Sequence, residues 1–180
     1  KNKIKFVLTS QQLRSKLADC GYTTFKKDKS GTEGKIINIH PELEYQKIEG
    51  FGGALTESAA VTLDRAGTNL REKVLMAYFD RNNGLNYSLC RTHINSCDFS
   101  TENYHYTEKN DRSLKTFNIE RDRKLLVPLI KDAQKVRGEK LNMLASPWSP
   151  PGWMKTTRKM NQGGKLRSDC RKILAEYYSK

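Results

Sequence analysis

The sequence predicts an α/β fold in which parallel strands alternate with helices, preceded by strands of a small antiparallel sheet. From residue 48 onward, short apolar stretches alternate with amphipathic stretches of helical period, and this alternation is typical of parallel βα architecture. Before residue 48, short β-type stretches are separated by turn-forming residues, which is typical of antiparallel strands. With 180 residues, 36% of them hydrophobic, the chain is long enough to bury a core.

The N-terminal segment, residues 1–47, contains short stretches with strand character. The expected strands are 4–9, 35–40 and 43–48, and the expected turns are Lys29-Ser30-Gly31 and His40-Pro41. We therefore expect this segment to form part of a small antiparallel sheet.

Residues 48–180 contain three strand-helix units in succession. The expected strands 48–55, 85–91 and 141–146 are followed by the expected helices 57–80, 121–136 and 168–178, respectively. In the second helix apolar residues recur at spacings of one, three and four, which predicts one buried face. We interpret that face as core and not as a binding site; it consists of Leu125, Leu126, Leu129, Ile130 and Ala133.

The chain is strongly basic, with 33 Lys and Arg against 20 Asp and Glu and a formal net charge of +13. Such a charge raises the question of a nucleic-acid or anionic membrane partner. The basic residues are spread along the whole length, however, without the aromatic-interleaved pattern of RNA-binding modules. We therefore expect a solvated basic surface and no nucleic-acid partner.

The four cysteines form no C-x-x-C pair and lie near no histidine cluster, which disfavours zinc and redox sites. No apolar run is long enough to cross a membrane or to serve as a signal peptide. We therefore expect no metal site, no transmembrane segment and no signal peptide in these residues, as in a mature secreted protein or a trimmed chain.

The segment 144–155 is the most distinctive, because an apolar strand runs into a loop with three prolines and both tryptophans of the chain. Proline fixes φ and removes backbone donors, so this loop holds its aromatic side chains at little entropic cost. A flat indole face fits the C–H face of a sugar or a nucleobase, which favours a binding surface. The alternative for Trp153 is a side chain that fills the core.

Glycines follow the start of the first expected strand, in Gly50-Phe51-Gly52-Gly53, where they allow close approach of the backbone. Thr56 is expected to cap the next helix. A phosphate-binding loop is disfavoured, because the segment lacks the Gly-Lys-Ser/Thr ending of a P-loop and the third glycine of a dinucleotide fingerprint.

Polar side chains follow Arg91, which is expected to end the second strand. A guanidinium buried there would need a carboxylate partner. His93, Asn95 and Asp98 form a group able to bind sugar hydroxyls, since a carboxylate accepts two hydroxyl hydrogens in a fixed geometry. The alternative is that Asp98 caps a turn and His93 is structural. The long polar connection 95–118 is a candidate functional loop, because loops after strand ends build the active sites of barrels.

A Ser-His-Asp hydrolase is disfavoured. No serine lies in a Gly-x-Ser-x-Gly motif, and the chain has only three histidines to serve as a base.

Three long motifs follow one another along the chain: Ile48-Glu49-Gly50-Phe51-Gly52-Gly53-Ala54-Leu55-Thr56, residues 91–100 ending in Ser96-Cys97-Asp98-Phe99-Ser100, and Leu144-Ala145-Ser146-Pro147-Trp148-Ser149-Pro150-Pro151-Gly152-Trp153-Met154-Lys155. In their order and spacing they resemble glycoside hydrolase family thirty, the glucosylceramidase-like enzymes, over about residues 40–180. The resemblance implies the N-terminal part of a (β/α)8 TIM barrel in residues 48–180, made of its first three βα units. It also implies strands of an accessory β-sandwich in residues 1–47.

The resemblance implies a retaining β-glycosidase, an O-glycosyl hydrolase acting on β-glucosides such as glucosylceramide or β-linked glucans. In this resemblance Asp98 matches the carboxylate that holds sugar hydroxyls, and Trp148 matches a tryptophan of the glycone pocket. Phe99 lies beside that pocket, and Arg91 matches the strand-end arginine that supports the catalytic carboxylates. No cofactor is implied, and the implied compartment is secreted, periplasmic or lysosomal.

The chain also departs from the family pattern. Thr92-His93 stands where the glucosylceramidase pattern has Val-Pro, and Pro150-Pro151-Gly152 alters the third motif. These departures bear on the aglycone that the enzyme prefers.

The catalytic carboxylates of such an enzyme are not found in this sequence. A (β/α)8 barrel typically needs about 250 residues, and a retaining enzyme needs two carboxylates about 5 to 5.5 Å apart. In the family these glutamates follow the fourth and seventh strands, the first in an Asn-Glu-Pro context that does not occur here. We therefore assign no catalytic role to Glu57, Glu102 or Asp98. We expect the catalytic glutamates beyond Lys180, in a remaining C-terminal part of the same enzyme.

The alternative is a non-catalytic carbohydrate-binding module that uses Trp148 and Asp98.

Overall fold

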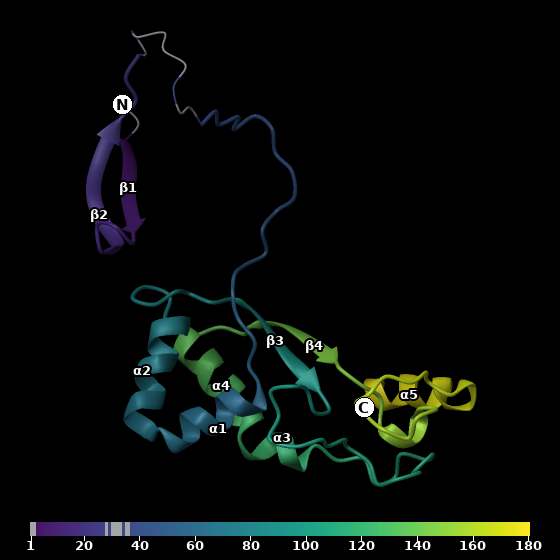
Figure 1. The fold of residues 1–180 in the computed structure, drawn as a ribbon. Helices are drawn as coiled ribbons and strands as arrows, with labels where there is room; N and C mark the ends of the chain where they lie inside the picture. Colours follow the sequence, from purple (N-terminus) through teal and green to yellow (C-terminus); the bar gives the residue numbers. More distant parts are fainter. Residues whose placement is uncertain (1–2, 28, 30–33, 35–36) are drawn as a thin grey trace. The chain divides into compact units, whose positions relative to one another are not determined.

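The computed structural model describes residues 3–27, 29, 34 and 37–180. Two compact units make up the chain, Lys1–Gln46 and Lys47–Lys180. Figure 1 shows the elements of both units in sequence colours.

The first unit contains an antiparallel pair, β1 (Lys3–Ser10) and β2 (Ser15–Thr24), whose register pairs Ile4 with Thr23 and Leu8 with Ala18. The strand expected at 4–9 is thus confirmed. β2 was not predicted, because polar residues and a glycine interrupt its hydrophobic alternation.

Of the other expectations for this part of the chain, one turn is confirmed and the remaining strands are not. The turn at His40-Pro41 is confirmed by a hydrogen bond from Leu43 N to His40 O of 3.0 Å. The strand predicted at 43–48 is wrong, since those residues are irregular and exposed and join neither sheet of the described residues. Of the strand predicted at 35–40, residues 35 and 36 lie outside the described residues and 37–40 are not strand. The turn predicted at 29–31 also falls largely outside them.

In the second unit the helices α1 (Glu57–Arg65), α2 (Thr68–Phe79) and α4 (Leu126–Arg137) pack against one another beside two strands. The strands are β3 (Leu89–Ile94) and β4 (Asn142–Pro147). Their register is parallel and pairs residues 89–94 with 142–147 in order, which confirms the predicted parallel βα pattern (Figure 1). The shorter α3 (Glu120–Lys124) precedes α4, and α5 (Arg171–Ser179) ends the chain.

The first expected strand of this unit, 48–55, is reduced to a single parallel bridge between Ala54 and Arg91. It nevertheless runs close against β3, because a Cβ on Gly52 would lie 1.7 Å from Leu89 O. Glycine is required at this position to allow that approach, as the sequence predicts.

Both long helices of the prediction are interrupted. The helix expected at 57–80 breaks at Gly67, whose φ of +82° lies in the left-handed region. The helix expected at 121–136 breaks at Leu125, with φ −133°. Pro128 explains this second break, because it has no N–H for the carbonyl four residues earlier and its ring clashes with that carbonyl. The N-cap prediction is confirmed: Thr56 Oγ1 accepts a hydrogen bond from Ala59 N at 3.2 Å.

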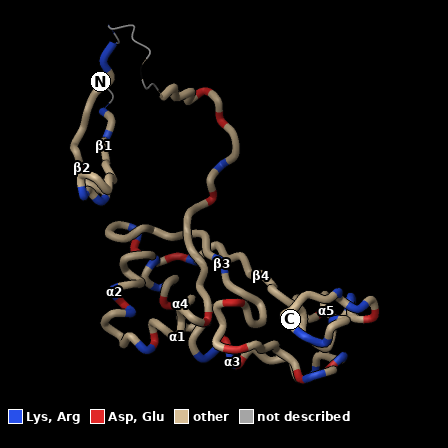
Figure 2. Tube along the Cα trace, viewed as in Figure 1, with Lys and Arg blue, Asp and Glu red and all other residues tan. Residues whose placement is uncertain are grey.

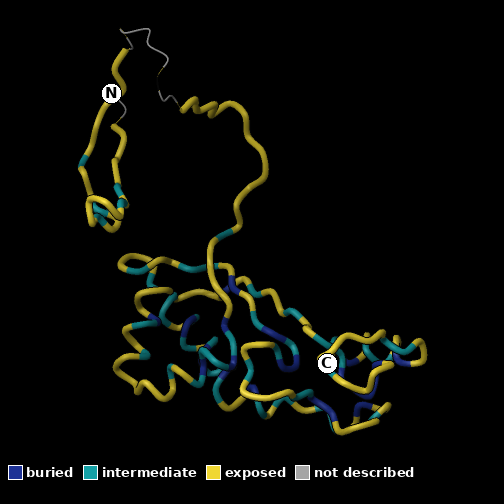
Figure 3. The backbone as a smooth tube through the Cα atoms, viewed as in Figure 1, coloured by how far each residue is buried: buried dark blue, intermediate teal, exposed yellow. Residues whose placement is uncertain are grey.

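The unit has two hydrophobic clusters, and Figure 3 shows which stretches of its backbone carry buried residues. The first joins α1, α2 and α4 to β3 and includes Leu129 and Ala133 of the predicted apolar face. Leu126 of that face is also buried, whereas Leu125 and Ile130 are partly buried against the cluster. The second surrounds Trp153 and Tyr177 and packs α5 against the loops after β3 and β4. Trp153 is therefore a core residue.

Candidate active site

The parallel strands β3 and β4 bring together Arg91, in the middle of β3, and Trp148, directly after β4. The Arg91 Cζ lies 5.2 Å from the centroid of the Trp148 ring, and its Nη2 donates a hydrogen bond to Ser146 Oγ at 3.3 Å. Trp148 is 49% exposed. This guanidinium differs from the expectation of a buried group at a strand end: Arg91 lies within β3 and is exposed. An exposed arginine needs no carboxylate, because water and the indole face satisfy it.

Asp98 and Phe99 lie on a tight turn in the loop after β3, and both are exposed. The turn is closed by hydrogen bonds from Ser100 N to Cys97 O at 3.1 Å and from Cys97 N to Ser100 Oγ at 3.0 Å. Ser58 N of α1 donates to Phe99 O at 2.9 Å, which ties the turn to that helix. Among the described residues, no hydrogen bond or ion pair joins Asp98 to Arg91.

Phe99 also lines an apolar cavity of about 590 Å³. Most of the other lining residues belong to α1 and α2, including Leu63, Val74 and Tyr78. Neither Arg91 nor Trp148 lines this cavity. The cavity therefore lies against the helices and the segment 53–56 and does not include the Arg91–Trp148 pair.

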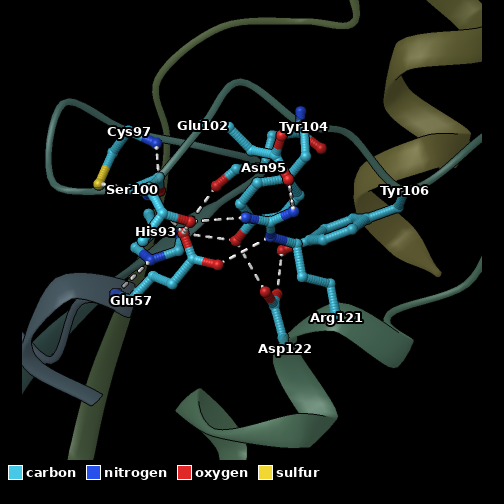
Figure 4. Close-up of polar contacts among 11 residues, drawn as sticks. Glu57, His93, Asn95, Cys97, Ser100, Glu102, Tyr104, Tyr106, Arg121 and Asp122 are labelled. Carbon is cyan, nitrogen blue, oxygen red and sulfur yellow. Dashed lines mark hydrogen bonds and ion pairs between the residues drawn. The ribbon is translucent and has the colours of Figure 1, made fainter. Parts of the chain in front are cut away.

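An ion pair joins α1 and α3 to the loop that follows the Asp98 turn, and its residues are labelled in Figure 4. Arg121 of α3 donates to Glu57 of α1 at 2.7 Å and also pairs with Glu102. Glu57 Oε2 accepts a hydrogen bond from Thr101 N at 2.9 Å. The Arg121 guanidinium lies over the Tyr104 ring, 4.3 Å from its centroid. One cation thus fixes the loop residues 101–104 against two helices.

Burial by itself would raise the pKa of Glu57, but the Arg121 hydrogen bond and charge and the Thr101 N–H outweigh it. The net result is a Glu57 pKa below its ordinary value. Glu57 is therefore a carboxylate at neutral pH, and both of its oxygens are already engaged by protein donors. Such a group stabilises structure.

His93 is buried and both of its ring nitrogens have hydrogen-bonding partners, with the Tyr104 hydroxyl as a further partner 3.5 Å from Nδ1, consistent with a structural histidine. Its Nε2 accepts from Glu57 N at 3.1 Å, so the proton lies on Nδ1, which donates to Asn95 O at 2.7 Å. The ring joins β3 to the first residue of α1 (Figure 4).

A third group consists of two tyrosines that share one carboxylate. Tyr104 and Tyr106 donate their hydroxyls to Asp122 at 2.7 and 2.5 Å. Burial, followed by the hydrogen bond to Asp122, raises the pKa of both tyrosines far above the ordinary value. Both therefore remain neutral donors at any physiological pH and hold the loop to α3.

These pairings were not predicted from the sequence. Glu57 and Arg121 lie 64 residues apart, and Arg121 was expected only as the first residue of a helix. The polar, tyrosine-rich composition of the connection 95–118 indicated a functional loop, but it did not indicate which residues the loop contacts.

Within the described part of the chain, no group of His, Cys, Asp and Glu has the arrangement of a metal site. All four cysteines are free thiols. No helix among the described residues has both the length and the apolar character to cross a bilayer. Lys and Arg are interspersed with Asp and Glu along the second unit in Figure 2.

Comparison with known proteins identifies the family. The sequence model of the "Glycosyl hydrolase family 30 TIM-barrel domain" matches residues 48–180. The chain belongs to glycosyl hydrolase family 30. Its curated relatives within the family include enzymes with two kinds of substrate in their names. The lysosomal acid glucosylceramidase of Mus musculus is 37% identical over 142 residues, which are 78% of this chain and 27% of that protein. The endo-1,6-beta-D-glucanase of Neurospora crassa is 33% identical over 126 residues, 68% of this chain and 26% of that protein.

The solved structure of SrfJ from Salmonella typhimurium is similar to this glycosyl hydrolase family 30 chain throughout. It matches with a TM-score of 0.83 and 34% identity, covering 97% of this chain and 39% of SrfJ. The chain spans about a quarter of the length of the curated relatives it matches.

Proposed function

We propose that the protein containing this chain is a retaining β-glycosidase that hydrolyses β-glucosides, with glucosylceramide or a β-linked glucan as substrate. The observation that carries the proposal is the contact between Arg91, within β3, and Trp148, which directly follows the carboxyl end of the parallel strand β4, in a chain of glycosyl hydrolase family 30. Ligands of TIM-barrel enzymes bind at this end of the strands. The names of the relatives support both substrate classes.

In this proposal Trp148 stacks on the apolar face of the sugar with its exposed indole. The free carboxylate of Asp98 accepts hydrogen bonds from two sugar hydroxyls. Phe99 flanks the sugar, and Arg91 supports the catalytic carboxylates by its charge. The two catalytic glutamates lie outside this sequence, in the part of the enzyme that follows Lys180, about 5 to 5.5 Å from each other as a retaining mechanism requires.

The proposal also assigns each part of the chain a place in the enzyme. Residues 1–47 contribute strands to an accessory β-sandwich, and residues 48–180 contribute the first three βα units of the barrel. The antiparallel β1–β2 pair and the parallel β3–β4 pair support this division. A secreted or lysosomal-type compartment is proposed from the name of the mouse relative.

The test is hydrolysis by the natural full-length protein of glucosylceramide in detergent micelles and of a β-1,6-glucan, with glucose release as the readout. We expect release from one of the two, and an at least tenfold lower kcat/KM in the Trp148→Ala variant, since aromatic stacking contributes about 1–3 kcal/mol in comparable sites. Release from neither substrate, nor from an aryl β-glucoside, would contradict the proposal. Saccharide binding without hydrolysis would favour the carbohydrate-binding module instead.

A further inference from the structure

Asn95 is a fully buried polar residue just after β3, with 0% exposure and a left-handed φ of +63°. Its carbonyl accepts from His93 Nδ1 at 2.7 Å (Figure 4), its Nδ2 donates to Ser149 O at 3.0 Å, and its Oδ1 accepts from the Tyr177 hydroxyl. Because the Ser149 carbonyl can only accept, the orientation of the amide is fixed. A buried amide with all these partners holds one conformation, since leaving any of them unpaired is costly.

These bonds reach both candidate sugar-binding groups. Ser149 follows Trp148 directly in the chain, and Asp98 lies three residues after Asn95. Ser149 is fixed a second time, because the buried Lys155 donates its Nζ to Ser149 Oγ at 3.2 Å. The backbone beside Trp148 is therefore tied to the loop with Asp98 through one side-chain amide.

We infer that Asn95 is a positioning residue that holds the Trp148 loop and the Asp98 turn in one relative placement. Asn95 touches neither ring nor carboxylate itself, so it acts through Ser149 and through the chain between residues 95 and 98. The expected effect of Asn95 on sugar affinity rests on the proposed function, whereas its expected effect on the placement of Trp148 is independent of that function.

Two variants test the link: one removes the amide itself, and the other removes one of the partners that hold the amide in place. Asn95→Gly keeps the left-handed backbone, which glycine adopts without strain, and removes only the amide. Tyr177→Phe keeps the buried ring and removes the hydroxyl that donates a hydrogen bond to Asn95 Oδ1. The matched controls are Asn110→Gly, at an exposed asparagine with the same φ of +63°, and Tyr178→Phe, at the neighbouring ring.

The first readout is ¹⁹F NMR of the natural full-length protein labelled with 5-fluorotryptophan, with Trp148 assigned from the Trp148→Phe variant. We expect the Trp148 resonance to shift or broaden in Asn95→Gly, and less strongly in Tyr177→Phe. Both control variants should leave it unchanged. The Trp153 resonance, from a core residue, reports general disturbance. An unchanged Trp148 resonance, or equal changes at both tryptophans, would overturn the inference.

The second readout is the division of the effect between KM and kcat for an aryl β-glucoside. Asn95→Gly should raise KM about tenfold and change kcat less than about threefold, because it loosens binding groups without touching the reacting atoms. A shifted Trp148 resonance with an unchanged KM would overturn the role in binding. If the unaltered protein hydrolyses no β-glucoside, the proposed function fails, and the ¹⁹F spectra alone decide whether Asn95 positions Trp148.

Discussion

The Arg91 guanidinium lies over the Trp148 ring, with Cζ 5.2 Å from the ring centroid. The contact joins neighbouring strands, because Arg91 belongs to β3 and Trp148 directly follows β4. A cation over an indole face contributes about 0.5–1 kcal/mol at an exposed site. The pair therefore restrains a half-exposed aromatic side chain.

Replacing Arg91 with lysine should weaken this restraint, because lysine keeps the charge but lacks a planar group to stack. We expect Arg91→Lys to raise KM for a β-glucoside two- to fivefold, corresponding to the loss of up to about 1 kcal/mol. Arg123→Lys is the control, since Arg123 is exposed and pairs only with Glu120 among the described residues. Equal KM values in both variants would show that the stacking has no part in binding.

Asp98→Asn tests the hydroxyl-binding carboxylate, since the amide keeps the size but loses the charge and one acceptor. We expect kcat/KM to fall ten- to a hundredfold, because hydrogen bonds to a charged group contribute about 1.5–3 kcal/mol. The thermal midpoint should stay the same, since Asp98 makes no side-chain hydrogen bond to the described residues. Asp64→Asn, at an exposed position of α1, should leave both quantities unchanged. A fall in stability with full activity would make Asp98 a turn cap instead.

The Glu57–Arg121 ion pair predicts a pH-dependent stability. The pKa of Glu57 is lowered in the folded state, so its contribution is present above its ordinary pKa of 4.5 and is lost as pH falls through the lower folded value. Glu57→Gln should lower the free energy of unfolding by about 1–3 kcal/mol at pH 7, and by less at pH 3.

Glu102→Gln is the matched control, because Glu102 pairs with the same arginine but is largely exposed. We expect it to cost less than about 1 kcal/mol. Urea titrations of the full-length protein at the two pH values measure both variants. A deficit for Glu57→Gln that is the same at pH 7 and pH 3 would refute the pairing.

Neighbouring glycines differ sharply in what they tolerate. A Cβ on Gly52 would meet Leu89 O at 1.7 Å, whereas one on Gly53 would meet only Tyr87 Cε2 at 3.7 Å. Gly52→Ala should therefore destabilise the fold by at least about 2 kcal/mol, since the β3 backbone must move. Gly53→Ala should change stability by less than about 1 kcal/mol. Similar thermal midpoints for the two variants would mean that the segment does not lie against β3 this closely.

Local signals predicted the parts of the fold that depend on local chemistry. The Thr56 cap, the buried face of α4 and the parallel pairing of β3 with β4 all follow from residues within one element or one unit. The breaks at Gly67 and Leu125 were also readable in principle, because a glycine and a proline mark them. At these two places the prediction followed the helical period of the apolar residues and continued each helix through the break.

Contacts between distant residues could not be predicted in the same way. Asn95 meets Tyr177 across 82 residues, and Arg121 meets Glu57 across 64. No periodicity encodes such pairs, since each joins separate elements: Asn95 follows β3 and Tyr177 lies in α5, whereas Arg121 lies in α3 and Glu57 in α1. The motifs did name Arg91 and Trp148, but their stacking and the exposure of Arg91 needed the three-dimensional structure.

The central claim is a retaining β-glycosidase, and ¹H NMR of the anomeric proton during hydrolysis of an aryl β-glucoside by the natural full-length protein tests it most directly. The account predicts that β-glucose appears first and that the α-anomer follows only by mutarotation, because two successive displacements retain the configuration. Initial release of α-glucose, or no hydrolysis at all, would contradict the account.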